Sequence, residues 1–236
     1  YSLALDLLND IYLGRYQPEH FLPSPSKIGE EKQVSVTTVR RTLTLLGHLG
    51  ATRSINGVGT QALSPADSSQ NCDFSQPVIQ KRLLDFAQSL QIMALTCGAC
   101  LEITLDAMDA MAIQWWRNRL LALKENGRYE SVVFDSLEVI PHFSPIRAVR
   151  EIYRQLLRIL IWGYPLRSLH GSREQINAFY LPYINSLLEG LRQGDKKRLA
   201  AALEQMLLCE FRFAAVRLEE LHVQGSAGLL VPEPFR

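Results

Sequence analysis

Four polar side chains downstream of Ser35 have the residue types and spacing of a DNA-reading surface. Thr37, Arg40, Arg41 and Thr44 are three or four residues apart, so on a helix they point to one side. An arginine guanidinium can donate two parallel hydrogen bonds to a guanine edge. Threonine hydroxyls and the free N–H groups of a helix N-terminus can bind phosphate. These residues predict contact with the major groove of DNA.

A helix must position these side chains, and the intervening residues have the pattern of one. Val36, Val39, Leu43 and Leu46 recur at helical spacing, which predicts an apolar face packed inward, opposite the polar side chains. Ser35 suits the N-cap, because its hydroxyl can accept a hydrogen bond from a first-turn N–H. We therefore predict that the recognition helix begins directly after Ser35.

A shorter helix is predicted before the recognition helix. Ser24 is a suitable N-cap, and Pro25 suits the first helical position, where a missing N–H has no cost. This predicts a helix over 25–32, followed by a tight turn at 33–34. With an apolar helical stripe over 2–13, the N-terminal region would contain three helices.

A β-hairpin is predicted after the recognition helix, which Gly50 would end. Residues 51–54 and 60–63 read as short strands, and the Asn56-Gly57 pair between them is a strong hairpin turn signal. Three helices followed by a glycine-rich hairpin have the order of a winged helix-turn-helix domain.

Five short motifs occur in order along this region. They are Gly14-Arg15-Tyr16, Leu22-Pro23-Ser24, Val34-Ser35-x-Thr37-Thr38-Val39-Arg40, Leu46-x-x-Leu49-Gly50 and Gly57-x-Gly59-Thr60. Their order and spacing resemble the GntR family of bacterial transcription regulators. The resemblance implies that residues 1–63 bind DNA, with Thr37, Thr38 and Arg40 in contact with it and Gly57 and Gly59 in a wing tip near the minor groove.

The sequence departs from the family pattern at two positions of the recognition helix. A basic residue is common in the family where Val36 stands, and an acidic one where Arg41 stands. We therefore expect a base preference different from that of well-known members. The predicted DNA-binding residues are Ser24, Ser35, Thr37, Thr38, Arg40, Arg41, Asn56, Gly57 and Gly59.

Composition bounds the class of protein. The 236 residues are 47% hydrophobic and 21% charged, as in an ordinary globular protein, and the formal net charge is +1. Residues 1–63 hold six basic and five acidic side chains, so we expect modest DNA affinity from one chain and a need for dimerisation. No signal peptide, membrane-length apolar run or disulfide framework is evident, which predicts a cytoplasmic protein without a membrane partner.

The rest of the chain predicts an all-helical bundle. Residues 64–77 are polar and without period, so we interpret them as a linker. Residues 78–224 have helical periodicity, interrupted at Cys97-Gly98 and at several Pro or Gly positions, whereas residues 225–236 read as an extended tail. The predicted helices cover 78–96, 101–126, 129–140, 144–163, 172–192 and 195–223. The fold class is therefore mainly α.

The helical region resembles the effector-binding and dimerisation domain of the FadR-like (FCD) branch. The similarity is clearest at Leu191-Arg-Gln-Gly194-Asp195 and the final helix through Met206. Many relatives bind a divalent metal through an aspartate and three histidines. Here the corresponding positions fall on 131–135, Ile184 and Met206, and none is histidine. We expect no metal and no other cofactor.

Two features of the helical region have open interpretations. Arg147, Arg150, Arg154 and Arg158 line one side of a predicted helix, as a clamp for an acidic effector or as a solvated face. Arg154 and Arg158 are the effector candidates, because Arg158 lies among apolar residues. The Cys97-Gly-Ala-Cys100 pair is either a redox or metal half-site, or two small residues in a crowded helix junction.

These patterns favour a transcription regulator over an enzyme, because we find no phosphate-binding glycine loop, nucleophile–base arrangement or catalytic carboxylate pair. We expect a cytoplasmic homodimer that binds a palindromic double-stranded operator and a small-molecule effector of acidic character. The alternative is a ligand-sensing or protein-interaction module with a vestigial DNA-binding domain.

Overall fold

The computed structural model describes residues 2–12, 15–17, 20–64, 68–127, 131–171 and 173–229. Gly14 and the end of the tail, residues 230–236, lie outside this part of the chain. The contacts divide the chain into two compact units. The N-terminal unit is Tyr1–Leu84 together with Ile161–His170, and the C-terminal unit is Asp85–Leu160 together with Gly171–Arg236.

Three helices form the core of the N-terminal unit. They are α1 (Ser2–Tyr12), α2 (Pro25–Lys32) and α3 (Val36–His48), and both α1 and α2 pack on α3. Their facing sides bury apolar residues, among them Leu7, Leu8, Ile28, Val39, Leu46 and Leu49. These are the three helices that the sequence predicts. Two residues differ from the predicted pattern, because Thr42 is buried on the inner side of α3 and Val36 is only half-buried.

Serine caps and a close turn set the angle between α2 and α3. Ser24 accepts a hydrogen bond from the Lys27 N–H at 3.3 Å, and Ser35 accepts one from the Thr38 N–H at 3.1 Å. A Cβ on Gly29 would lie 2.9 Å from the Val34 carbonyl oxygen, so the turn can approach α2 only where a glycine stands. These local features are those that the sequence predicts for a helix-turn-helix.

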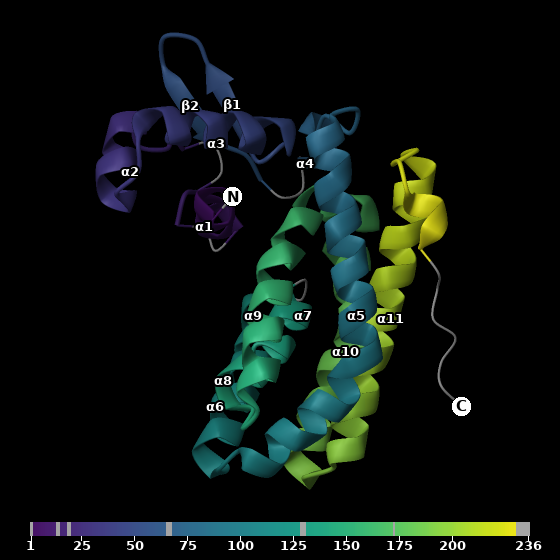
Figure 1. Cartoon of the computed structure of the whole chain (residues 1–236). Coiled ribbons are helices and arrows are strands. Elements are labelled where there is room, and N and C mark those ends of the chain that lie inside the picture. The colour runs from purple at the N-terminus through teal and green to yellow at the C-terminus, as the bar shows by residue number, and fades with distance from the viewer. Residues whose placement is uncertain are drawn as a thin grey trace. The chain divides into compact units, whose positions relative to one another are not determined.

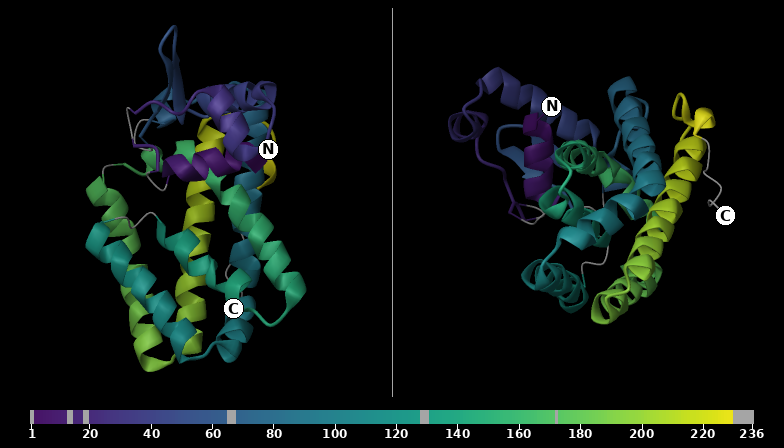
Figure 2. Two further views of the ribbon diagram at one scale, coloured as in Figure 1. Left: turned by 90° about the vertical axis from the view of Figure 1, so that its left-hand side faces the viewer. Right: turned by 60° about the horizontal axis from the view of Figure 1, so that its bottom comes forward.

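A two-stranded antiparallel sheet follows α3. Strands β1 (Thr52–Ile55) and β2 (Gly59–Ala62) pair with Thr52 opposite Ala62 and Ile55 opposite Gly59. Gly50, with φ of 75°, ends α3. Figure 2 shows the hairpin projecting from the helices of its unit as a wing. The predicted hairpin is confirmed, with β1 one residue later and β2 one residue earlier than expected.

Two further segments belong to the N-terminal unit. The short helix α4 (Ser68–Asn71) lies in the stretch predicted as a linker, and the Asp73 N–H donates to the His48 carbonyl at 2.7 Å. The 3-10 helix η3 (Ile161–His170) follows a helix of the C-terminal unit in sequence, yet it packs against α4 and α1. The sequence predicts no such element, and residues 161–163 were expected to end a long helix.

The C-terminal unit is helical, as predicted. Its elements are the greater part of α5 (Pro77–Ala107), which begins in the N-terminal unit, and α6 (Ala110–Asn126), α7 (Val132–Leu137), α8 (Val139–Phe143), α9 (Arg147–Leu160), α10 (Arg173–Gln193), α11 (Lys196–Glu220) and η4 (Ser226–Gly228). Figure 1 shows α10 and α11 running alongside each other, and the two helices pack together. Asp195 caps α11, accepting a hydrogen bond from the Arg198 N–H at 3.0 Å.

The predicted break at Cys97-Gly98 is wrong, because α5 continues through it. Gly98 faces α11, where the Glu204 side chain occupies the space that a Cβ would take. The glycine therefore lies under a side chain of α11 rather than at a helix end. Conversely, the predicted helix over 129–140 is interrupted, since α7 ends at Leu137 and α8 extends through Pro141.

Helix α5 also corrects the expectation that no apolar stretch reaches membrane length. Among the described helices it alone is long and apolar enough to cross a bilayer by length and composition. Within its most apolar window of 18 residues, 44% is buried inside the protein. Buried helices of globular proteins pass the same test, so this property does not distinguish a membrane span from a core helix.

Candidate nucleic-acid interface

The N-terminal end of α3 is exposed and polar. Thr37, Arg40, Arg41 and Thr44 are all exposed, as the helical spacing predicts. The first-turn N–H groups of Val36 and Thr37 have no partner among the described residues. Unpaired N–H groups and the positive end of the helix dipole attract anions, so this end of α3 can accept phosphate oxygens.

Arg40 and Arg41 are available to bind an anion. Within the described part of the chain, neither guanidinium forms a hydrogen bond or ion pair, and the same is true of the Lys27 ammonium. Asp10 pairs with Arg15 at 2.7 Å and with Lys32 at 3.5 Å. The small net charge of this region is therefore unevenly distributed, with the free positive charge on α3 and in the first turn of α2.

The serine and threonine hydroxyls near the turn are partly committed to the fold. The Ser35 and Thr38 hydroxyl oxygens lie 2.8 Å apart in a hydrogen bond, and Ser35 also caps α3. The Thr44 hydroxyl donates to the Arg40 carbonyl at 3.0 Å. Ser24 caps α2. Thr37 alone among the predicted hydroxyl residues of α3 has no such bond within the described residues, so its hydroxyl is the most available for DNA.

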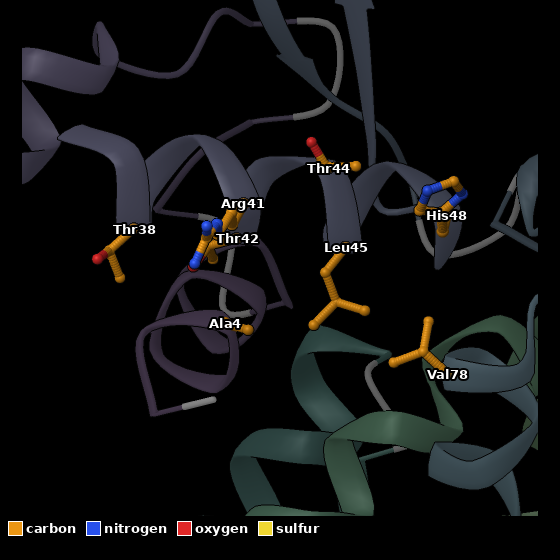
Figure 3. Close-up of a pocket in the computed structure, with 8 residues that line it drawn as sticks. All are labelled: Ala4, Thr38, Arg41, Thr42, Thr44, Leu45, His48 and Val78. Carbon is orange, nitrogen blue, oxygen red and sulfur yellow. The ribbon is translucent and has the colours of Figure 1, made fainter. Parts of the chain in front are cut away.

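An open groove of about 520 Å³ runs along one side of α3. Figure 3 shows the residues of α3, α1 and α5 that line it: Ala4, Thr38, Arg41, Thr42, Thr44, Leu45, His48 and Val78. Arg41 lines this groove, whereas Arg40 and Thr37 do not. The two neighbouring arginines, which the sequence predicts as one DNA-reading pair, therefore lie on different surfaces of the same helix.

The wing tip is exposed and tightly turned. Asn56 and Gly57 are exposed, and the Val58 side chain is 64% exposed. Gly57 has φ of 74° and Gly59 has φ of 152°, both in the region that favours glycine. A Cβ on Gly57 would meet nothing within 4 Å, so the turn conformation rather than crowding favours glycine there.

Three polar residues of the N-terminal unit were not among the predicted DNA-binding residues: Lys27, Thr42 and His48. Lys27 is exposed in the first turn of α2, and Thr42 and His48 line the groove beside Arg41. The groove could not be predicted from the sequence of α3, because its far wall comes from α1 and α5.

The effector candidates lie on the exposed side of α9. Arg154 donates to Glu151 at 2.6 Å and to the Pro141 carbonyl at 3.4 Å. Arg158 is exposed, and no partner for it occurs in the described residues. The buried side of α9 is apolar apart from the hydroxyl of Tyr153, which hydrogen-bonds to Thr96 at 2.8 Å. The arginines therefore face away from the helical core.

Apart from Glu138 Oε2, which forms an ion pair with Arg119, three buried polar atoms of the C-terminal unit lack a hydrogen-bond partner among the described residues. They are the Trp116 indole nitrogen on α6, the Ser136 hydroxyl on α7 and the Asn177 amide oxygen on α10. Trp116 and Ser136 are both fully buried, and α6 packs on α7 and on α10. An unsatisfied buried polar group is costly, so such atoms often bind water or a ligand.

The cysteine pair lies in an environment that keeps thiols protonated. Burial raises the pKa of Cys97 and, to a smaller extent, that of Cys100. A protonated thiol is a poor nucleophile and a poor metal ligand. Within the described residues, no group of three or more His, Cys, Asp or Glu side chains is placed to hold a metal ion.

Comparison with known proteins supports the assignment of the N-terminal domain. Residues 2–61 match the sequence model described as "Bacterial regulatory proteins, gntR family". A search of curated proteins gives no match. The solved structure of E. coli McbR/YncC is similar with a TM-score of 0.51 and 16% identity, over 92% of this chain and 96% of that one.

Two other solved structures are more distantly similar, each at 16% identity. Streptococcus agalactiae GntR has a TM-score of 0.39, covering 89% of this chain and 98% of its own. A structure titled "Lar controls the expression of the Listeria monocytogenes agr system and mediates virulence" has a TM-score of 0.43, covering 92% and 96%. Taken with the helix order, the capped α3 and the wing, the match at residues 2–61 identifies this chain as carrying the helix-turn-helix domain of the gntR family of bacterial regulatory proteins.

Proposed function

We propose that this protein is a dimeric transcription regulator that binds a palindromic operator and responds to a small molecule. The observation that carries the proposal is the N-terminal end of α3. It presents free N–H groups and two arginines without partners among the described residues, on a domain of the gntR family. Insertion of this end into the major groove would satisfy both the N–H groups and the arginines.

The two arginines have different proposed roles. Arg40 and Thr37 lie outside the groove on the exposed side of α3, where they can reach base edges. Arg41 lines the groove with Thr38 and His48, a concave surface suited to the DNA backbone. Asn56 and Gly57 at the wing tip are proposed to lie near the minor groove. Lys27 in α2 is proposed to add a further phosphate contact.

Dimerisation supplies the affinity that a single domain lacks. Of the six basic side chains in residues 1–63, three (Lys27, Arg40 and Arg41) have no partner in the described structure, so each chain can neutralise few phosphates. Two domains on half-sites about one helical turn apart would combine their contacts. A palindromic operator follows from the two-fold symmetry of such a dimer.

The C-terminal unit is the proposed sensor. Three unpartnered polar atoms on α6, α7 and α10 are the candidate ligand contacts, because a small polar molecule would supply the hydrogen bonds that they lack. The expectation of an acidic effector rests on Arg154 and Arg158, which can pair with a carboxylate on the exposed side of α9. Binding would shift the population between chain arrangements that do and do not fit the operator. This role is that of a cytoplasmic regulator rather than an enzyme.

Selection from a random duplex pool, using the purified chain, tests the DNA-binding proposal. The enriched duplex is then titrated by fluorescence anisotropy at several salt concentrations. We expect a palindrome whose affinity falls steeply with salt, because binding releases counterions. Enrichment of no sequence would contradict the proposal and favour a ligand-sensing or protein-interaction module with a vestigial DNA-binding domain.

A thermal-shift screen tests the sensor. Small carboxylic acids are screened for a rise in melting temperature of the wild type, and each hit is repeated with Trp116→Phe and Ser136→Ala. A hit that loses its shift in these variants supports a site at the buried polar atoms. A hit that instead fails only with Arg158→Ala places the site on the exposed side of α9.

A further inference from the structure

The segment 161–166 lies between two helices of the C-terminal unit in sequence but forms part of the N-terminal unit. Residues Ile161–His170 cluster with Tyr1–Leu84, and η3 packs on α4 and α1. The segment is well buried there, with Trp162, Tyr164 and Leu166 each no more than 2% exposed. Its side chains are therefore core residues of the unit that carries the winged domain.

Tyr164 holds the end of the wing. Its hydroxyl donates a hydrogen bond to the Leu63 carbonyl at 3.0 Å, across 101 residues of sequence, in a buried environment. Leu63 directly follows β2, and its own N–H donates to the Ala51 carbonyl at 2.9 Å. The tyrosine thus donates a hydrogen bond to a buried backbone carbonyl directly after β2, the last strand of the wing. Such a carbonyl would otherwise be left without a partner.

Trp162 of the same segment contacts α5, the helix that follows the wing and α4. The Arg82 guanidinium carbon lies 5.4 Å from the centroid of the Trp162 ring, a cation–π contact. Arg82 lies in the part of α5 that belongs to the N-terminal unit. Two aromatic residues of one short segment therefore contact the connection between the wing and α5. Tyr164 contacts it at Leu63, and Trp162 contacts it at Arg82 of α5.

We propose that residues 161–166 are a clasp through which the C-terminal unit controls the position and stability of the wing. The clasp continues directly into α9 at one end and, through residues 167–170, toward α10 at the other. A rearrangement of either helix would change the bond between Tyr164 and Leu63. The regulatory part of this inference rests on the proposed function, whereas the structural part does not.

Hydrogen exchange of the full chain, read by mass spectrometry, tests the structural part. Tyr164→Phe leaves the Leu63 carbonyl without its partner, and we expect exchange of amides in 51–63 to speed up about five- to thirtyfold. Tyr183→Phe is the matched control, because its hydroxyl donates to Cys209 at 3.2 Å within the C-terminal unit. That variant should leave exchange of 51–63 unchanged. Unchanged exchange in Tyr164→Phe, or equal acceleration in both variants, would overturn the clasp.

Exchange of the wild type at increasing urea keeps the inference testable if Tyr164→Phe does not fold. Amides of 161–166 and of β2 should then open together, at a lower urea concentration or with a different slope than amides of α10 and α11. Opening of 161–166 together with α10 and α11, independently of β2, would contradict the inference.

The selected duplex tests the regulatory part, because coupling between two sites is reciprocal. Binding of the duplex to the winged domain should slow exchange of amides in 161–166. If the duplex binds without changing the exchange of amides in 161–166, the regulatory part of the inference is contradicted and the structural part is unaffected. If no duplex is bound at all, the proposed function fails, but the exchange experiments still decide whether the clasp exists.

Discussion

Arg40 and Arg41 are adjacent in sequence but serve different surfaces of α3. Successive residues of an α-helix are rotated by about 100°, so the side chains of two neighbours point in different directions. Arg41 lines the groove with residues of α1 and α5, whereas Arg40 lies outside it. At the scale of single residues, we propose from this difference that Arg40 reads bases and Arg41 contacts the DNA backbone.

Replacing each arginine by alanine should therefore have different consequences. Arg40→Ala is expected to lose about 1–3 kcal/mol of binding to the selected palindrome and little on unrelated duplexes, since a base contact discriminates sequence. Arg41→Ala should weaken binding to all duplexes alike and reduce the salt slope by about one, as a phosphate contact does. Anisotropy titrations of both variants on the two kinds of duplex provide the measurement.

Arg212→Ala is the control for these variants, because Arg212 is an exposed arginine on α11. It should bind both kinds of duplex like the wild type. Uniform loss in Arg40→Ala together with sequence-dependent loss in Arg41→Ala would reverse the two assignments.

Ser35 has a structural role that can be separated from DNA contact. Its hydroxyl accepts the Thr38 N–H, so Ser35→Ala should lower the free energy of unfolding by about 1 kcal/mol. Ser35→Asp should keep the cap and the stability, because a carboxylate also accepts this bond and favours a helix N-terminus. The added negative charge should nevertheless repel phosphate and weaken DNA binding. Urea unfolding and anisotropy measure the two effects, and tight DNA binding by Ser35→Asp would place the phosphates elsewhere.

At the scale of secondary-structure elements, the angle between α2 and α3 depends on a glycine. Gly29 lies in α2, and the Val34 carbonyl of the turn approaches it so closely that a Cβ would lie 2.9 Å from the oxygen. Backbone atoms cannot move aside as a flexible side chain can. The helix-turn-helix geometry is thus fixed by one close backbone contact as well as by two serine caps.

Gly29→Ala should lower the free energy of unfolding by about 1–2 kcal/mol, because the clash outweighs the better helix propensity of alanine. Gly47→Ala on α3 is the matched control. Its Cβ would lie 3.9 Å from the nearest atom, the Thr52 carbonyl oxygen, so only the gain of up to about 1 kcal/mol in propensity remains. Urea unfolding of both variants decides between these effects, and a midpoint for Gly29→Ala at or above that of the wild type would contradict the argument.

At the scale of the whole molecule, the proposed function requires two chains on one operator. Sedimentation velocity of the purified chain should give twice the 26.7 kDa of one chain. Titration of the selected palindrome should saturate at two chains per duplex, and a duplex with one half-site scrambled should bind far more weakly. A monomer that binds single half-sites with full affinity would contradict the proposed dimer.

The sequence by itself determined the winged domain, because that domain is built from strong local signals. Ser24 and Ser35 cap their helices, Gly50 ends α3, and Asn56-Gly57 turns the wing, each through interactions within a few residues. The helical class of the remaining chain was also predictable, since periodicity is a local property. The exposure of Arg40 and Arg41 followed from the same periodicity.

Only the tertiary structure decided the features that depend on contacts between distant segments. The break expected at Cys97-Gly98 is absent, since α5 continues through it and the Glu204 side chain of α11 lies over the glycine. The groove beside Arg41 exists because α1 and α5 supply its other wall. Tyr164 meets Leu63 across 101 residues, and no local pattern encodes that bond. The physical reason is that burial and long-range hydrogen bonds outweigh the small local preferences that a sequence displays.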